Sequence, residues 1–72
     1  MKKIKKIEIK VNGKLRSISD NFKILDLVKD LKIPLKKVAI ELNREIIDKK
    51  NISKISIKKN DKIEIVHFIG GG

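Results

Sequence analysis

Three glycines at the end of this 72-residue sequence, Gly70-Gly71-Gly72, are the residues best suited to chemistry. Glycine has no Cβ and a free choice of φ, so a glycine tail can enter a narrow catalytic cleft of another protein. The terminal carboxylate would then be the reacting group. ATP can convert this poor acyl donor to an acyl adenylate, and sulfide can displace the adenylate to leave a thiocarboxylate. The alternative is a frayed chain end, and composition alone leaves both interpretations open.

The size of the chain argues against a catalytic site of its own. A chain of 72 residues holds one domain and buries only ~60% of the surface that it exposes when unfolded. It contains no cysteine, which excludes disulfides, thiolate metal sites and thiol nucleophiles. No apolar run approaches the ~18 residues of a membrane span. Without a signal peptide or cysteine, we expect a cytoplasmic protein.

The strongest compositional feature is a formal net charge of +10, from 19 Lys and Arg against 9 Asp and Glu. Such a charge suggests nucleic acid or an anionic membrane as a partner. However, lysine is scattered along the whole chain, and no Arg-rich run or set of interleaved aromatic residues appears. We therefore expect no membrane and no specific nucleic acid as partner, and a small basic nucleic-acid-binding module stays as an alternative.

The first half of the sequence predicts a hairpin followed by a helix. Alternating apolar residues over 7–11, the pair Asn12-Gly13 and extended character afterwards predict a β-hairpin over residues ~4–19. Ser19-Asp20-Asn21 offers capping side chains. Helical spacing then relates four apolar residues: Ile24, Leu27, Val28 and Leu31. We expect a helix of two to three turns that Pro34 ends.

The second half predicts strands separated by irregular segments. Alternation predicts a third strand over 38–42, a turn at 43–45 and a short fourth strand at 46–47. Residues 48–59 fit either a wrapped loop with a helical turn or an irregular strand. A last strand covers 63–66 and continues into 67–69. One helix can then cover one face of a small mixed sheet.

Five segments of the sequence carry a resemblance to a known family: residues 7–13 (IEIKVNG), 24–28 (ILDLV), 38–47 (VAIELNREII), 60–69 (NDKIEIVHFI) and 70–72 (GGG). They closely resemble the thiamine-biosynthesis sulfur carriers (ThiS). The stretch from Glu64 to Gly72 is the specific part of the resemblance.

The resemblance implies an α+β fold of the ubiquitin-like β-grasp type. Its expected architecture is a mixed four- to five-stranded sheet with one helix packed on one face. Residues 1–67 would form a single β-grasp domain, and residues 68–72 a flexible C-terminal glycine tail.

The resemblance also implies a role as a co-substrate that is itself no enzyme. An E1-like, ThiF-like adenylyltransferase would adenylate the carboxylate of Gly72, while Gly70 and Gly71 thread into that enzyme. A relay from a cysteine desulfurase would supply sulfur, and the thiocarboxylate would serve a ThiG-like thiazole synthase. The carrier would bind no cofactor, since the activating partner consumes the ATP.

The end of the last strand is the expected docking region. Val66 and Phe68 lie on the strand face opposite Ile63, and apolar anchors dominate small interfaces. We therefore expect Val66, Phe68 and Ile69 to contact partners. We expect neither a catalytic residue nor a metal ligand, because His67 is the only histidine and lacks companions.

Two other functions share this tail chemistry and stay open. One is the MoaD-like small subunit of molybdopterin synthase, although that family tends to carry prolines shortly before its glycines. The other is a ubiquitin-like modifier that is conjugated to lysines.

Overall fold

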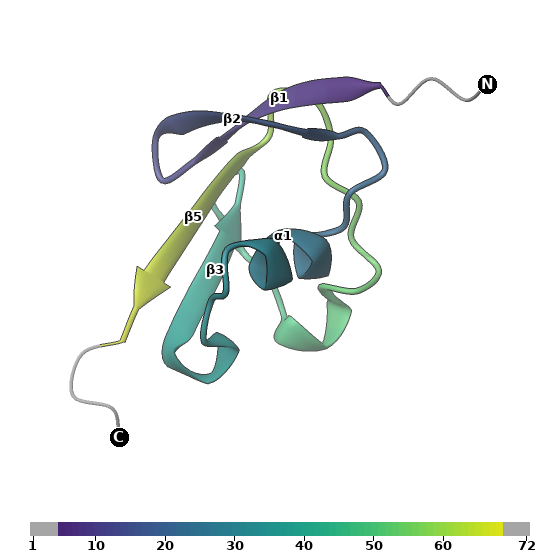
Figure 1. The fold of residues 1–72 in the computed structure, drawn as a ribbon. Helices are drawn as coiled ribbons and strands as arrows, with labels where there is room; N and C mark the ends of the chain where they lie inside the picture. The colour runs from purple at the N-terminus through teal and green to yellow at the C-terminus, as the bar shows by residue number, and fades with distance from the viewer. Residues whose placement is uncertain (1–4, 69–72) are drawn as a thin grey trace.

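A computed structural model describes residues 5–68 and shows a five-stranded sheet with one α-helix on one face (Figure 1). The elements are β1 (Lys6–Val11), β2 (Lys14–Ser19), α1 (Ile24–Asp30), β3 (Val38–Leu42), β4 (Glu45–Ile46) and β5 (Lys62–His67). The strands lie in the order β2-β1-β5-β3-β4. β1 and β5 are parallel, and the other neighbours are antiparallel. The expected α+β architecture with a mixed sheet is confirmed.

The first hairpin forms where the sequence predicts it. Asn12 and Gly13 have φ of 51° and 81°, the positive values that a two-residue type I′ turn requires. The side-chain oxygen of Asn12 accepts a hydrogen bond of 2.7 Å from the amide of Ile65. This bond fastens the tip of the hairpin to β5.

A second two-residue turn joins β3 to β4. Asn43 and Arg44 have φ of 51° and 73°, so a bulky residue occupies the position that glycine takes in the first hairpin. Because the turn has only two residues, β4 covers Glu45–Ile46. The predicted strand at 46–47 was therefore wrong by one residue.

Replacing Arg44 by glycine is expected to stabilise the fold. The left-handed conformation costs a residue with a Cβ about 1 kcal/mol, and glycine escapes that cost, so Arg44→Gly should raise the free energy of unfolding by about 0.5–1 kcal/mol. Urea denaturation measures the change. Arg44→Ala is the matched control, because alanine keeps the Cβ. Equal stability of the two variants would contradict the account.

The helix forms on the predicted apolar face, but both of its ends differ from the prediction. Its N-cap is Lys23, whose amide donates to the Asp26 carboxylate at 2.8 Å. The predicted capping residues are not used, because the Ser19 hydroxyl donates to the Asn21 side chain instead, at 2.6 Å. Residues 19–21 lie too early in the chain to reach the first turn.

The C-terminus of α1 is also set by local geometry and not by Pro34. Lys32 takes a positive φ of 55°, and its amide donates to the carbonyl of Lys29 at 3.2 Å. The amide of Ile33 donates to the carbonyl of Val28 at 3.0 Å. This pair of bonds is a Schellman motif, which turns the chain before Pro34 is reached.

Residues 48–59 form a wrapped loop that contains a helical turn, one of the two predicted alternatives. A 3-10 turn covers Lys49–Asn51, and the Asp48 side chain accepts from the amide of Lys50 at 2.9 Å. An isolated bridge joins Ser56 to Lys23 beside α1. The loop contributes Ile52 and Ile57 to the core.

The core lies between α1, the loop and one face of the sheet, and it consists of aliphatic residues. Its buried members are Ile9, Ile18, Ile24, Leu27, Val28, Val38, Ile40, Ile52, Ile57 and Ile63. No polar side chain is buried in the described part of the chain. No helix within residues 5–68 is long and apolar enough to cross a membrane.

Candidate functional site

The glycine tail itself, Gly70-Gly71-Gly72, and the predicted contact residue Ile69 lie outside the described residues. The structure shows the strand that leads to them. β5 pairs with β1 on one side and β3 on the other, and the amide of Phe68 donates to the carbonyl of Lys37 at 2.9 Å. Backbone hydrogen bonds therefore connect the chain to the neighbouring β3 segment as far as Phe68. This end of β5 points away from the N-terminus (Figure 1). The predicted boundary of the tail at residue 68 stays a prediction.

Alternate residues of β5 face opposite sides of the sheet, as the sequence predicts. Ile63 is 1% exposed and packs in the core, and Ile65 is half-buried. Val66 and Phe68 are 49% and 56% exposed. The side of the sheet away from α1 is called the open face below, and Val66 projects from it.

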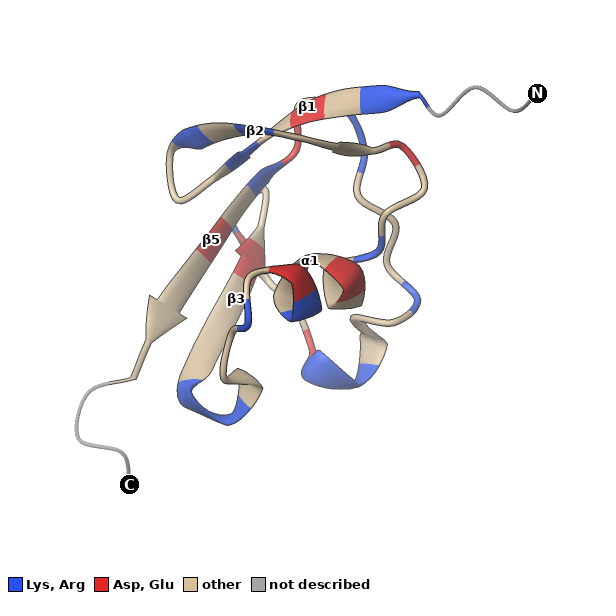
Figure 2. Cartoon of the chain, in the orientation of Figure 1, with Lys and Arg blue, Asp and Glu red and all other residues tan. Residues whose placement is uncertain are grey.

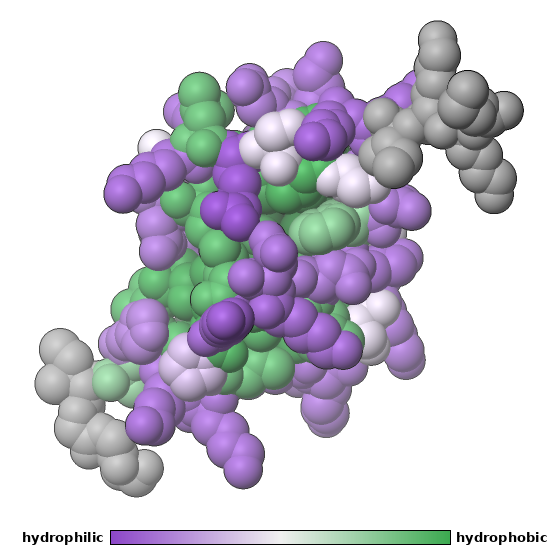
Figure 3. Space-filling model, in the orientation of Figure 1, coloured by the Kyte–Doolittle hydropathy of each residue, from purple (hydrophilic) through white to green (hydrophobic). Residues whose placement is uncertain are grey.

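The open face carries two further exposed apolar residues. Ile46 is 76% exposed and pairs with Glu41 across β3 and β4, while Leu15 is 66% exposed and lies on the edge strand β2. Sequence reasoning did not identify Ile46 as a surface residue, because it predicted only the bounds of this strand, one residue too late, and not its pairing with β3. Interpreting Asn43-Arg44 as a two-residue turn would have placed Ile46 in β4 with its side chain on the open face. In Figure 3, apolar surface shows between hydrophilic side chains along the side that carries β5.

Phe68 has a cationic neighbour. The ammonium group of Lys49 lies 5.4 Å from the centroid of the Phe68 ring, within the range of a cation–π interaction. Lys49 belongs to the 3-10 turn after β4. The contact lies directly after the end of β5.

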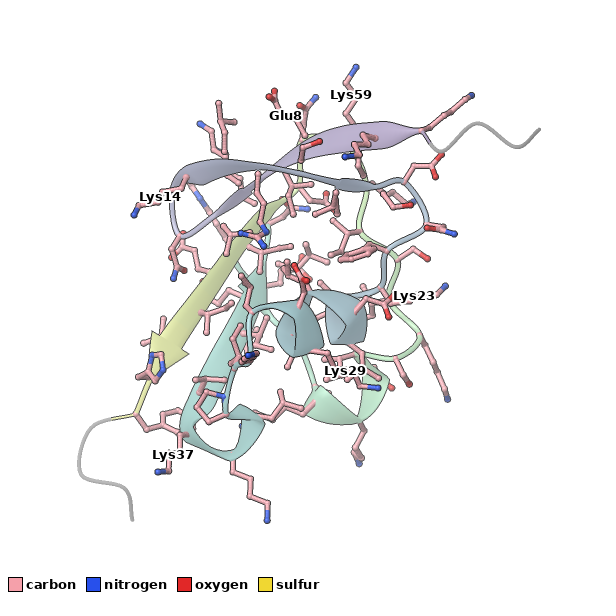
Figure 4. The ribbon with its side chains drawn as sticks, viewed as in Figure 1. Glu8, Lys14, Lys23, Lys29, Lys37 and Lys59 are labelled. Carbon is pink, nitrogen blue, oxygen red and sulfur yellow. The ribbon has the colours of Figure 1, made fainter. Side chains whose placement is uncertain are left out.

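The lysines surround the domain and do not gather in one stripe (Figure 2). In Figure 4, Lys14, Lys23, Lys29, Lys37 and Lys59 project from different sides of the molecule. Arg16 and Asp30 form a salt bridge of 2.9 Å, with side chains 39% and 52% exposed, and such surface pairs add only about 0–1 kcal/mol. The distribution is typical of a solvated surface more than of a nucleic-acid groove.

His67 lies at the exposed end of β5, opposite Val38 on β3. Among residues 5–68 no three His, Cys, Asp or Glu side chains come together as a metal site would require. For the tail adenylation that the resemblance implies, His67→Asn is expected to change the rate by no more than about twofold, well below the ~10²-fold loss that removal of a general acid–base group causes. Steady-state adenylation kinetics measure this rate, and a tenfold loss would show that the imidazole takes part in chemistry.

The structure has the ubiquitin-like β-grasp fold. One helix packs on a mixed sheet of order β2-β1-β5-β3-β4, and the central last strand leads to the glycine tail. Within this class, the ThiS family model matches residues 9–72. The chain belongs to the ThiS family, and the resemblance found from the sequence is confirmed.

Individual relatives agree with this assignment. The sulfur carrier protein ThiS of Bacillus subtilis is 38% identical over 65 residues, which is 89% of this chain and 98% of that protein. The crystal structure of the thiamine biosynthesis protein ThiS from Geobacter metallireducens has a TM-score of 0.81 at 28% identity, covering 92% of this chain and 100% of the other.

A third relative is a much longer protein. The thiazole synthase of Paramagnetospirillum magneticum is 36% identical over 66 residues, or 92% of this chain. The chain spans only 20% of that protein's length.

Proposed function

We propose that this chain carries sulfur for thiazole formation in thiamine biosynthesis, as a thiocarboxylate on Gly72. The observation that carries the proposal is the family match over residues 9–72, which includes the whole glycine ending. A relative whose printed name is sulfur carrier protein is matched over 98% of its length. The geometry agrees, because the central strand β5 leads directly to the tail.

The proposed chemistry takes place at the terminal carboxylate. A carboxylate oxygen attacks the α-phosphorus of ATP, pyrophosphate leaves, and Gly72 becomes an acyl adenylate. The terminal sulfur of a persulfide on the relay then attacks the carbonyl carbon and AMP leaves, which gives an acyl disulfide. A thiol reduces the S–S bond of this disulfide, so that sulfur replaces one oxygen as a thiocarboxylate. The carrier supplies only the carboxylate and the surface that the enzymes bind; the partner binds and consumes the ATP. Such chemistry fits the cytoplasm, the compartment expected from the sequence.

Three partners belong to this proposal: a ThiF-like adenylyltransferase, a cysteine desulfurase relay and a ThiG-like thiazole synthase. Two relatives support the last of these. Thiazole synthases of Paramagnetospirillum magneticum and Magnetococcus marinus each match this chain over about one fifth of their length, at 36% and 30% identity. A carrier-like stretch within the same polypeptide as a thiazole synthase supports this partner.

Reconstituted thiazole synthesis tests the function. The thiocarboxylated chain is supplied as the sole sulfur source to thiazole synthase and its other substrates, and the same chain is offered to the large subunit of molybdopterin synthase. We expect thiazole to form and molybdopterin not to form. Molybdopterin without thiazole would assign the chain to the MoaD-like alternative. A salt-sensitive affinity for nucleic acid that survives deletion of Gly71 and Gly72 would favour the basic binding module.

The net charge of +10 is expected to speed association with an acidic face of the activating enzyme. Charge steering weakens as the Debye length falls, so the association rate should drop about tenfold between low and high salt. Stopped-flow mixing at several ionic strengths measures it. An association rate that does not change with ionic strength would show that the net charge does not steer this encounter.

A further inference from the structure

We propose that Glu41 and Glu64 form an anionic clamp that binds an arginine side chain of the activating enzyme. The inference rests on the proposed function, because it names the contact by which that enzyme holds the carrier. It concerns the middle of the open face, whereas the docking residues expected from the sequence lie at the end of β5.

The two glutamates face each other directly across antiparallel strands. Glu41 on β3 pairs with Glu64 on β5, between the pairs Ile40–Ile65 and Leu42–Ile63. Since Ile40 and Ile63 are buried on the side of α1, both glutamates project from the open face. Directly paired residues have Cβ atoms about 4.5–5.5 Å apart, and like charges in this arrangement destabilise a sheet. Figure 2 shows the acidic segments of β3 and β5 side by side.

These two carboxylates differ from the acidic groups that serve the fold. Within residues 5–68, neither Glu41 nor Glu64 takes part in a salt bridge or a side-chain hydrogen bond. Four aspartates do, and each holds a turn, a helix end or a strand: Asp26, Asp30, Asp48 and Asp61. The two glutamates therefore repel each other, and within residues 5–68 neither makes a side-chain interaction that would stabilise the fold.

The surroundings of the pair fit an arginine in particular. Ile46 lies beside Glu41 on β4, and Val66 lies two residues beyond Glu64 on β5; both are exposed. An arginine can lay its apolar stem on such residues, while its planar guanidinium donates to both carboxylates. Arginine is also one of the residue types that contribute most binding energy at interfaces when apolar neighbours surround it.

The position of the pair relative to the tail indicates that the arginine belongs to an enzyme that acts on the tail, and the activating enzyme is the first of these in the proposed reaction sequence. Gly72 is eight residues beyond Glu64, and an extended chain spans at most ~3.6 Å per residue, so the pair lies within about 29 Å of the terminal carboxylate. An enzyme that holds this carboxylate in its active site must therefore lie close to the end of β5. The open face continues from that end to Glu64 and Glu41.

The direction in which Glu→Gln substitutions change the affinity for the activating enzyme distinguishes an arginine clamp from attraction by net charge. Each Glu→Gln change raises the formal net charge from +10 to +11. If an acidic partner is attracted only by net charge, the variants bind at least as well as the natural chain. If an arginine sits between the carboxylates, the variants bind less well, because the guanidinium loses its partners.

The experiment compares Glu41→Gln, Glu64→Gln and the double variant with the matched control Glu45→Gln. Glu45 makes the same charge change, but it pairs with Leu42 and so lies on the opposite face of the sheet. Adenylation by the activating enzyme is followed with the carrier as the varied substrate. We expect KM to rise about tenfold for each single variant, with kcat within twofold. Melting temperatures should stay equal or rise by a few degrees, since repulsion is removed.

Unchanged KM values for the glutamine variants, with the natural chain adenylated normally, would overturn the clamp and leave the proposed function standing. An equal rise in KM for Glu45→Gln would also overturn it. No adenylation of the natural chain by a competent enzyme would overturn the proposed function and the clamp together.

Discussion

Deletion of Gly71 and Gly72 is expected to abolish thiocarboxylate formation while the domain stays folded. The reacting carboxylate would move back by two residues, about 7 Å of extended chain. Because a displacement of about 1 Å can cost ~10²-fold in rate, we expect a loss of at least ~10³-fold. The buried core runs from Ile9 to Ile63, so the deletion removes none of it and the melting temperature should not change.

Gly72→Ala is the matched control for this deletion. It keeps the carboxylate at the same place in the chain and adds only a Cβ. We expect adenylation to persist at a rate reduced about 10–100-fold, because the methyl group has to fit a cleft shaped for glycine. If the deleted chain still acquires sulfur at the natural rate, the carboxylate of Gly72 is not the required reacting group.

Val66→Asp is expected to reduce kcat/KM for adenylation by about 10–100-fold, because a carboxylate would have to be desolvated in an apolar contact. Val66 is 49% exposed, so its replacement opens no cavity in the core. The melting temperature should fall by no more than about 5 °C. Steady-state kinetics with the activating enzyme and a thermal melt check the two expectations.

Leu15→Asp provides the control for Val66→Asp. Leu15 is also an exposed apolar residue, at 66%, but it lies on the edge strand β2, separated from β5 by β1. We expect its kinetics to stay within about threefold of the natural chain, as for other surface substitutions. Natural kinetics for Val66→Asp would remove Val66 from the docking surface.

Local signals predicted most of the elements. Asn12-Gly13 places the first turn because both residues tolerate positive φ, and the spacing of Ile24, Leu27 and Val28 identifies the buried side of α1. Each of these signals lies within a few residues of the structure that it determines. The alternation along β5 likewise identified Val66 as exposed.

The remaining features depend on conformations and pairings that sequence spacing does not contain. Lys32 and Arg44 adopt positive φ although both carry a Cβ, so neither the end of α1 nor the start of β4 was predicted correctly. The parallel pairing of β1 with β5 joins the two ends of the chain. The pairing of Glu41 with Glu64 likewise follows only from the register of β3 against β5.

For the candidate site, the resemblance to ThiS supplied the tail chemistry, and the structure supplied the face beside it. Gly70, Gly71, Gly72 and Ile69 stay predictions, since they lie outside the described residues. Val66 and Phe68 are exposed as expected, and their role in docking is what the variants above test. Ile46 and the glutamate pair became visible only with the register of the sheet.

The mass of the intact chain, after incubation with ATP, the activating enzyme and a sulfur source, tests the central claim most directly. We expect the mass to rise by the difference between one sulfur and one oxygen atom, with the change confined to the C-terminal fragment. An unchanged mass in the presence of an enzyme that sulfurates another ThiS carrier would contradict the claim.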